Sequence, residues 1–150
     1  MTSIHILTQI KAQVQDVFDA ARNIDLHQNS AHQTHEKAIA GKTSGWIELG
    51  ETVTFRGKHF GIYLTHTSKI IKMEQPHFFV DEMIQGKFKS FKHLHFFEKK
   101  DDVTIMTDIV EYETPFGFAG KLFDILFLKN HLEHFICERA YFLKHFIENK

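Results

Sequence analysis

The last part of the sequence constrains the fold more than any other segment. Apolar residues recur there at three- and four-residue steps or multiples of them, which predicts one helix from Phe118 to His145. Such a helix has about 30 residues and is roughly 45 Å long. Further phenylalanines and leucines make its apolar face too broad for a narrow stripe, so it must be covered by a sheet or by a partner. A homodimer, in which a second copy of the chain covers this face, therefore remains an alternative. The repeating positions are Phe118, Leu122, Ile125, Leu132, Ile136, Leu143 and Ile147.

The preceding segment predicts the sheet that covers this helix. Alternating and β-branched residues predict strands at 51–58, 62–73, 77–84, 87–98 and 103–114, with one more at 3–10 and a short one near 36–42. Gly57 and Gly61 bracket one expected turn, and residues 99–102 form a polar hairpin tip. Short links imply antiparallel neighbours. Two short helices, at 14–22 and 23–30, follow the first strand. The class is α+β, with a curved seven-stranded antiparallel sheet around the C-terminal helix.

Composition narrows the setting of this fold. The 150 residues suit a single domain spanning 1–150. A formal charge of -1 without a Lys/Arg-rich run gives no electrostatic reason to bind nucleic acid. Cys137 is the only cysteine, so no internal disulfide can form, and the N-terminus lacks a basic start followed by a long apolar stretch. No apolar run approaches the ~20 residues that span a bilayer. We expect a cytoplasmic protein without a membrane span.

The most informative polar pattern lies on the last predicted hairpin. Period-two geometry places Phe91, His93, His95 and Phe97 on one face of a strand. If the tip is centred between Lys100 and Asp101, then His93 lies opposite Asp108, His95 opposite Met106 and Phe91 opposite Val110. Opposed side chains are close enough for a His–Asp hydrogen bond. The pair is either a structural cross-strand contact, a polar hook for a ligand, or an acid/base pair in which the carboxylate orients the imidazole.

The 12 histidines also raise the question of a metal. His93 and His95 share a strand face, and His59 and His66 flank the neighbouring hairpin. A third convergent ligand is needed, and no HExxH motif or paired-cysteine spacing supplies one. His131, His134 and Glu138 are spaced as on a solvated helix. Cys137 has no neighbour that would lower the pKa of its thiol. We expect no metal, no other cofactor and no cysteine nucleophile.

Three segments carry a resemblance to a known family. They are residues 74–82 (EQPHFFVDE), residues 86–97 (GKFKSFKHLHFF) and residues 104–117 (TIMTDIVEYETPFG). They resemble the aromatic-FxD, GPF…HxHxF and TxxxDxVxYxxPxG segments of one subgroup of the START-like superfamily, also called SRPBCC, which includes polyketide cyclases/dehydrases and lipid-transport proteins. Lys87 departs from the proline that is usual in this subgroup. The resemblance implies a helix-grip fold and does not settle an activity.

A curved sheet under one helix rarely fills completely, which favours an apolar pocket between them. The first hypothesis is a non-enzymatic module that binds or carries a small hydrophobic molecule. The alternative is a cyclase- or dehydratase-like enzyme that uses His93 and Asp108 for proton transfer, so whether the chain is an enzyme stays open. A protein–protein binding role with a vestigial pocket is a third hypothesis. The candidate ligand-binding residues are Phe91, His93, His95, Met106, Asp108, Val110, Tyr112, Leu122 and Ile125.

Overall fold

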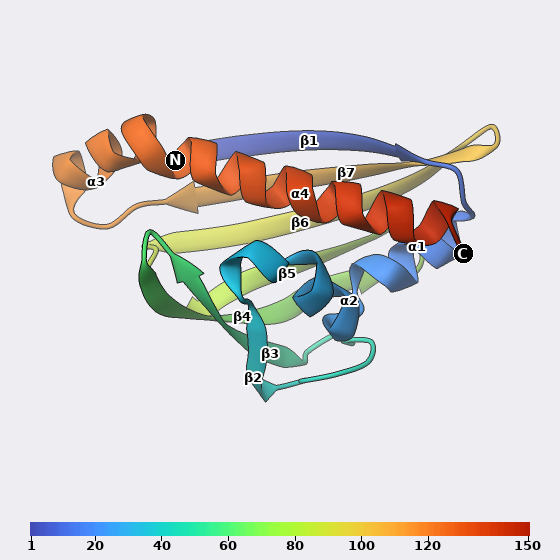
Figure 1. Cartoon of the computed structure of the whole chain (residues 1–150), viewed down its shortest axis with the longest axis horizontal. Helices are drawn as coiled ribbons and strands as arrows, with labels where there is room; N and C mark the ends of the chain where they lie inside the picture. The colour runs from blue at the N-terminus through green and yellow to red at the C-terminus, as the bar shows by residue number, and fades with distance from the viewer.

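The computed structural model describes residues 1–150, with the side chain of His32 left aside. One antiparallel sheet and a long C-terminal helix dominate it (Figure 1). The elements are β1 (Thr2–Ile10), α1 (Val14–Ala21), α2 (Ile24–Ser30), η1 (His32–Thr34), β2 (Lys37–Gly41), β3 (Thr52–His59), β4 (Ile62–Glu74), β5 (Phe78–Gln85), β6 (Ser90–Lys100), β7 (Val103–Glu113), α3 (Gly117–Phe123), the π-helical turn η2 (Asp124–Leu128) and α4 (Lys129–Glu148).

The seven strands lie in the order β1-β7-β6-β5-β4-β3-β2, and every neighbouring pair is antiparallel. Consecutive strands from β2 to β7 are neighbours, as their short links require, and β1 closes the far edge beside β7. Helix α4 runs along this sheet and packs on β1, α1 and α2, so that the C-terminus lies close to α1 (Figure 1). The predicted α+β helix-grip class is confirmed.

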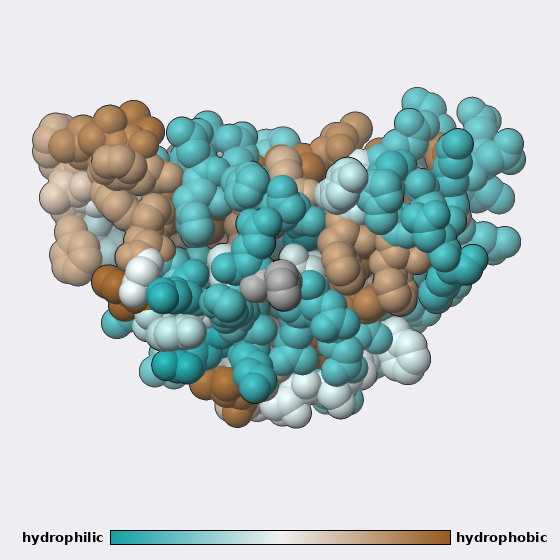
Figure 2. Space-filling model, viewed as in Figure 1, coloured by the Kyte–Doolittle hydropathy of each residue, from teal (hydrophilic) through white to brown (hydrophobic). Residues whose placement is uncertain are grey.

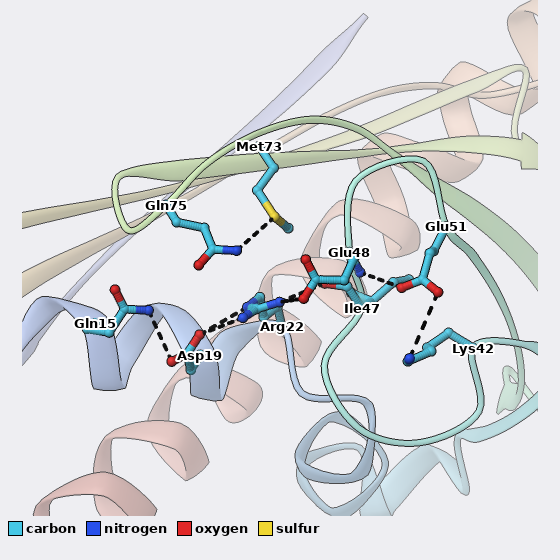
Figure 3. A network of polar contacts seen from close by, with 9 residues as sticks. All are labelled: Gln15, Asp19, Arg22, Lys42, Ile47, Glu48, Glu51, Met73 and Gln75. Carbon is cyan, nitrogen blue, oxygen red and sulfur yellow. Dashed lines mark hydrogen bonds and ion pairs between the residues drawn. The ribbon is translucent and has the colours of Figure 1, made fainter.

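Local sequence explains why the short helices sit where they do. Val17 and Phe18 are completely buried on one face of α1. The Asn23 side chain accepts a hydrogen bond from the Leu26 N–H at 3.0 Å and so caps α2. Beyond α1, Arg22 donates to Asp19 and to Glu48 and ties the helix to the loop before β3 (Figure 3). These contacts fix α1 and α2 across one end of the sheet.

Two details of the sheet differ from the sequence prediction. The β6–β7 tip is a two-residue turn at Asp101 and Asp102, with Lys100 paired to Val103. The register is therefore shifted by two residues, because Asp101 adopts a left-handed conformation (φ 55°) and takes the first turn position. Phe91, His93 and His95 face Tyr112, Val110 and Asp108 respectively. Because the shift is even, every side chain keeps the predicted face.

Gly57 also lies elsewhere than predicted. It belongs to β3 and pairs with Leu64, whereas the turn to β4 is made by Phe60 and Gly61, both with positive φ. The reason is that strand β3 continues to His59 before the chain reverses.

The C-terminal helix spans 32 residues, as predicted in extent, but it is not regular throughout. The π-helical turn η2 separates α3 from α4. Its first residue, Asp124, is buried and accepts hydrogen bonds from the hydroxyl groups of Thr2 and Tyr112. The inserted turn lets a carboxylate reach the sheet from within an apolar helix.

The buried and the exposed apolar side chains of the C-terminal helix lie in different parts of it. The buried stripe of α4 packs against the sheet and the short helices, whereas α3 and η2 expose most of their apolar side chains. Figure 2 shows these brown side chains gathered at the end of the molecule where α3 lies. The exposed group is Phe116, Phe118, Leu122, Phe123, Ile125, Leu126 and Phe127. No helix of the described chain is both long enough and apolar enough to cross a membrane.

Candidate functional site

A cavity of about 510 Å³ lies between the sheet and the helices. Its wall is mostly apolar, with contributions from β3, β4, β5, β6, α3 and α4. Several lining side chains are also exposed, including Phe60 at 50% and Phe123 at 42%, which marks where the cavity opens to solvent. Those apolar lining residues that are buried include Ile24, Ile47, Val53, Phe55, Ile70, Phe79, Leu132 and Ile136.

A chain of four polar side chains crosses three strands at the cavity wall. His93 Nε2 lies 2.8 Å from Asp108 Oδ1, and His95 Nδ1 lies 3.4 Å from the same oxygen. On its other side, His95 Nε2 lies 2.7 Å from Asp81 Oδ2. The chain thus runs from β5 through β6 to β7. The predicted His93–Asp108 contact is confirmed, but the shifted register makes it diagonal and not directly opposed.

This polar chain has a defined charge distribution. Burial acts to raise the pKa of Asp108, but hydrogen bonds from His93 and His95 outweigh it and hold the pKa well below its ordinary value. The same balance brings the pKa of Asp81 to about 2. Burial lowers the pKa of His93, and the charge of His95 lowers it further. For His95, the two carboxylates outweigh burial and raise the pKa. Both carboxylates are ionised at neutral pH, and the proton resides on His95 in preference to His93.

Aromatic stacking fixes the two imidazoles. The rings of His93 and His95 stack with centroids 3.7 Å apart, and Phe79 stacks on the opposite face of His95 at 4.0 Å. Phe97 continues the column beyond Phe79 at 5.9 Å. Alternate residues of β6 and the neighbouring β5 build this column because strand geometry places them on one face. The imidazoles are thereby held in one orientation.

A second polar group lies near the opening of the cavity. His59 Nδ1 and His131 Nε2 are 2.9 Å apart and join β3 to α4. The other nitrogen of His59 lies 3.5 Å from Glu36 Oε2. Burial acts to raise the pKa of Glu36, but contacts with His27 and His59 bring it to about 2. Gly57 makes room for this carboxylate, since a Cβ there would lie 1.5 Å from Glu36 Oε2.

The predicted ligand-binding residues divide into three groups. Phe91, His93 and His95 line the cavity. Met106 and Asp108 line a much smaller adjacent pocket, while Val110 and Tyr112 are buried in the core beside α4. Leu122 and Ile125 do not line the cavity: they are 47% and 74% exposed, because α3 and η2 turn these side chains to solvent. Whether any of the nine binds a ligand stays a prediction.

Sequence reasoning missed several polar residues of the cavity wall, among them His27, Glu36, Asp81 and Arg139. Asp81 could not be predicted because its contact with His95 depends on the β5–β6 register. For Arg139, the sequence did contain a usable signal. It lies three residues after Ile136 in the apolar stripe of the predicted helix, and a charge in such a stripe is unusual.

One group of side chains comes close to a metal-binding arrangement. Asp81, His93 and His95 each offer a ligand atom, and these atoms lie within 4.8 Å of one another. Two histidines and a carboxylate are a common donor set for divalent transition metals. However, hydrogen bonds already use His93 Nε2, His95 Nε2 and Asp81 Oδ2, and the stacked rings are nearly parallel, at 19°. A metal would have to displace these bonds and tilt the rings, so the arrangement fits an internal hydrogen-bond network better.

Comparison with known proteins finds solved structures of the same fold. No protein-family profile matches the sequence, and no curated protein sequence matches it either. TTHA0849 from Thermus thermophilus is similar with a TM-score of 0.74 at 12% identity, over 95% of this chain and 97% of that one. The KanY protein reaches 0.76 at 13% identity, over 98% and 97%. Major latex-like protein 151 from Panax ginseng reaches 0.69 at 15% identity, over 97% of both chains. Identities this low establish a common fold alone.

Proposed function

We propose that this protein is a member of the START-like (SRPBCC) superfamily that binds or carries a small hydrophobic molecule in the cavity between sheet and α4. The observation that carries the proposal is the cavity itself. Its volume of about 510 Å³ falls within the range of small-molecule sites, ~300–1,000 Å³. Its wall combines an apolar majority with a few fixed polar groups, which is the composition that orients an apolar ligand. The single cysteine allows no internal disulfide, which suits the reducing cytoplasm as the place of this activity.

Uptake of an uncharged apolar dye, Nile red, tests the proposal. We expect saturable binding with one dye per chain and enhanced fluorescence. Ser68 is buried on β4 and lines the cavity, whereas the next residue, Lys69, is exposed on the opposite face. Ser68→Leu should therefore weaken dye binding by filling the cavity, and Lys69→Leu should leave it unchanged. Equal effects of the two variants, or no binding by the natural chain, would contradict the proposal.

The alternative is a cyclase- or dehydratase-like enzyme, favoured by the hydrogen bond between His93 and Asp108 at the cavity. A carboxylate that orients a neutral imidazole is an arrangement used for general-base catalysis. The test is the fate of a natural ligand extracted from the purified protein. Conversion by the natural chain that stops in His93→Gln, with ligand binding retained, supports the enzyme. Recovery of the ligand unchanged after prolonged incubation favours the carrier.

A homodimer is the partner that the sequence left open, and it remains part of the proposal. The exposed apolar side chains around α3 and η2 form a surface that a second copy could cover. Sedimentation analysis of the natural chain and of Phe118→Ser tests this. We expect a dimer that the substitution weakens, and a monomer at every protein concentration would contradict it.

A further inference from the structure

Arg139 is a buried cation in the wall of the cavity. Its side chain is 9% exposed, and its Nη2 donates to the backbone oxygen of Ala21 at 2.8 Å. Among the described residues, its Nε has no hydrogen-bond partner, and no carboxylate lies within 4.0 Å of the guanidinium. Buried charges are normally paired because their desolvation is costly. The guanidinium therefore has donor capacity that the described residues do not fill.

The neighbouring carboxylates do not supply this contact. Asp108 accepts from His93 and lies beside His95, and Asp81 accepts from His95. Their charges reach Arg139 only through space. Burial lowers the pKa of Arg139 more than these two charges raise it. Arg139 is thus balanced electrostatically at a distance, while the acceptors nearby are engaged by histidines.

A second unpartnered nitrogen lines the same cavity. His27 Nε2 is buried without a hydrogen-bond partner among the described residues, and its 4.0 Å separation from Glu36 Oε1 is too long for one. Burial, together with the charge of Arg139, lowers the pKa of His27 to about 4. The ring is neutral at pH 7 and can donate or accept a hydrogen bond. Stacking on Phe55 at 4.0 Å holds it in place.

We propose that Arg139 and His27 bind the polar end of the ligand, and that this end is a carboxylate on an otherwise apolar molecule. The inference rests on the proposed function, because it specifies the ligand of the same cavity. Arginine has donors only, and its planar fork matches the two oxygens of a carboxylate. A hydroxyl offers a weaker, single contact. An amine would bring a positive charge next to the guanidinium of Arg139, whereas a carboxylate brings the opposite charge.

A series of ligands with one chain length tests the choice of end group. Nile red bound to the natural chain is displaced with dodecanoate, dodecanol or dodecylamine at pH 7.5. We expect dodecanoate to compete at roughly tenfold to a hundredfold lower concentration than dodecanol, since a hydrogen bond to a charged group contributes about 1.5–3 kcal/mol. Dodecylamine should be the weakest. Equal competition by the three compounds, or a preference for the amine, would overturn the inference.

Two variants assign the preference to Arg139. Arg139→Met keeps the length of the side chain without its charge and should bind Nile red while losing the advantage of dodecanoate. Arg56→Met, at an exposed position on β3, is the matched control and should retain that advantage. An unchanged advantage in Arg139→Met would overturn the inference. If Arg139→Met does not fold, as judged by circular dichroism, Arg139→Lys replaces it in the test. This variant keeps the positive charge but loses the planar guanidinium, and it should show a reduced preference for dodecanoate over dodecanol. Failure of the natural chain to bind Nile red would instead refute the proposed function.

Discussion

Asp108 is the residue on which the buried polar chain depends. Both imidazoles of β6 turn a nitrogen toward the same oxygen of this carboxylate, and the three side chains are nearly inaccessible to water. Removing the carboxylate leaves two buried rings short of an acceptor. Removing one ring leaves a buried negative charge with fewer donors. In either case the cost comes from the group that stays behind, not only from the contact that is lost.

A double-mutant cycle on His93 and Asp108 measures this dependence. Asp108→Ala should lower the free energy of unfolding by about 1–3 kcal/mol, measured by urea denaturation. The double variant with His93→Ala should lose less than the sum of the two single losses, because each single change strands the other partner. Thr107→Ala, on the opposite face of β7, is the control and should combine additively with His93→Ala. Additivity of His93→Ala with Asp108→Ala would mean that the two groups are neighbours without coupling.

The sequence predicted this part of the site only in outline. Strand periodicity is sufficient to put His93, His95 and Asp108 on one face, and an even register error leaves that face unchanged. The contact of Asp81 with His95 could not be predicted, because it depends on the β5–β6 register, in which Asp81 pairs with His93. Likewise, the unfilled Nε of Arg139 depends on where the carboxylates of other elements lie, which no local pattern encodes.

At the scale of elements, the chain passes very close to itself at the corner between β7 and α3. Phe116 adopts a left-handed conformation (φ 67°) directly before the helix begins. Gly120 then passes so close to this corner that a Cβ would lie 1.8 Å from the backbone oxygen of Pro115. Because a backbone atom is the obstacle, the helix itself would have to move. The corner therefore sets how α3 leaves the sheet.

Gly120→Ala tests the importance of this close approach. Replacing glycine by alanine inside a helix normally stabilises it by roughly 0.5–1 kcal/mol. Here we expect a loss on the order of 1–3 kcal/mol in the free energy of unfolding, as for other overpacked sites. Gly86→Ala is the comparison, because its Cβ would meet the flexible end of Met83 at 2.6 Å, which can shift. Its effect on thermal or urea unfolding should be smaller. A stabilised Gly120→Ala variant would contradict this expectation and show that the backbone at the corner can shift to accommodate a Cβ.

The elements themselves were predictable because their patterns are long. Strand and helix ranges agree with the structure within a few residues, apart from the start of β6 at Ser90 and the turn after β3. The π-helical turn escaped prediction, because apolar residues continue through it in the sequence. Asp124 was the available signal: an acidic residue amid apolar neighbours, whose partner Tyr112 is far away in the sequence.

For the molecule as a whole, buried neutral histidines make stability depend on pH. Burial lowers the pKa of His27, His66, His93 and His131, so the unfolded chain takes up protons at these sites first as the pH falls below about 6.5. His95 acts in the opposite direction. Its raised pKa adds stability that is complete below about 6.5 and disappears as the pH rises through the folded value. Four sites act in the first direction and His95 alone in the second, so we expect stability to fall on acidification.

We expect a lower free energy of unfolding at pH 5 than at pH 7 in urea titrations. For His27, with a pKa of about 4, the contribution over this interval is on the order of 1–2 kcal/mol. His27→Gln should therefore flatten the pH dependence by about that amount. His134→Gln, at a position exposed on α4, should leave it unchanged. Equal stability of the natural chain at pH 5 and pH 7 would contradict the neutral state of these histidines in the fold.

The stacked column of Phe97, Phe79, His95 and His93 has a spectroscopic consequence. A proton above the face of an aromatic ring is shielded by the ring current, so the carbon-bound protons of His95 should resonate well upfield of those of an exposed histidine. Its nitrogen-bound protons, held between carboxylates and away from water, should exchange slowly and appear far downfield. This nearly inaccessible imidazole thus carries its own magnetic signature, by which its protonation can be followed without a label.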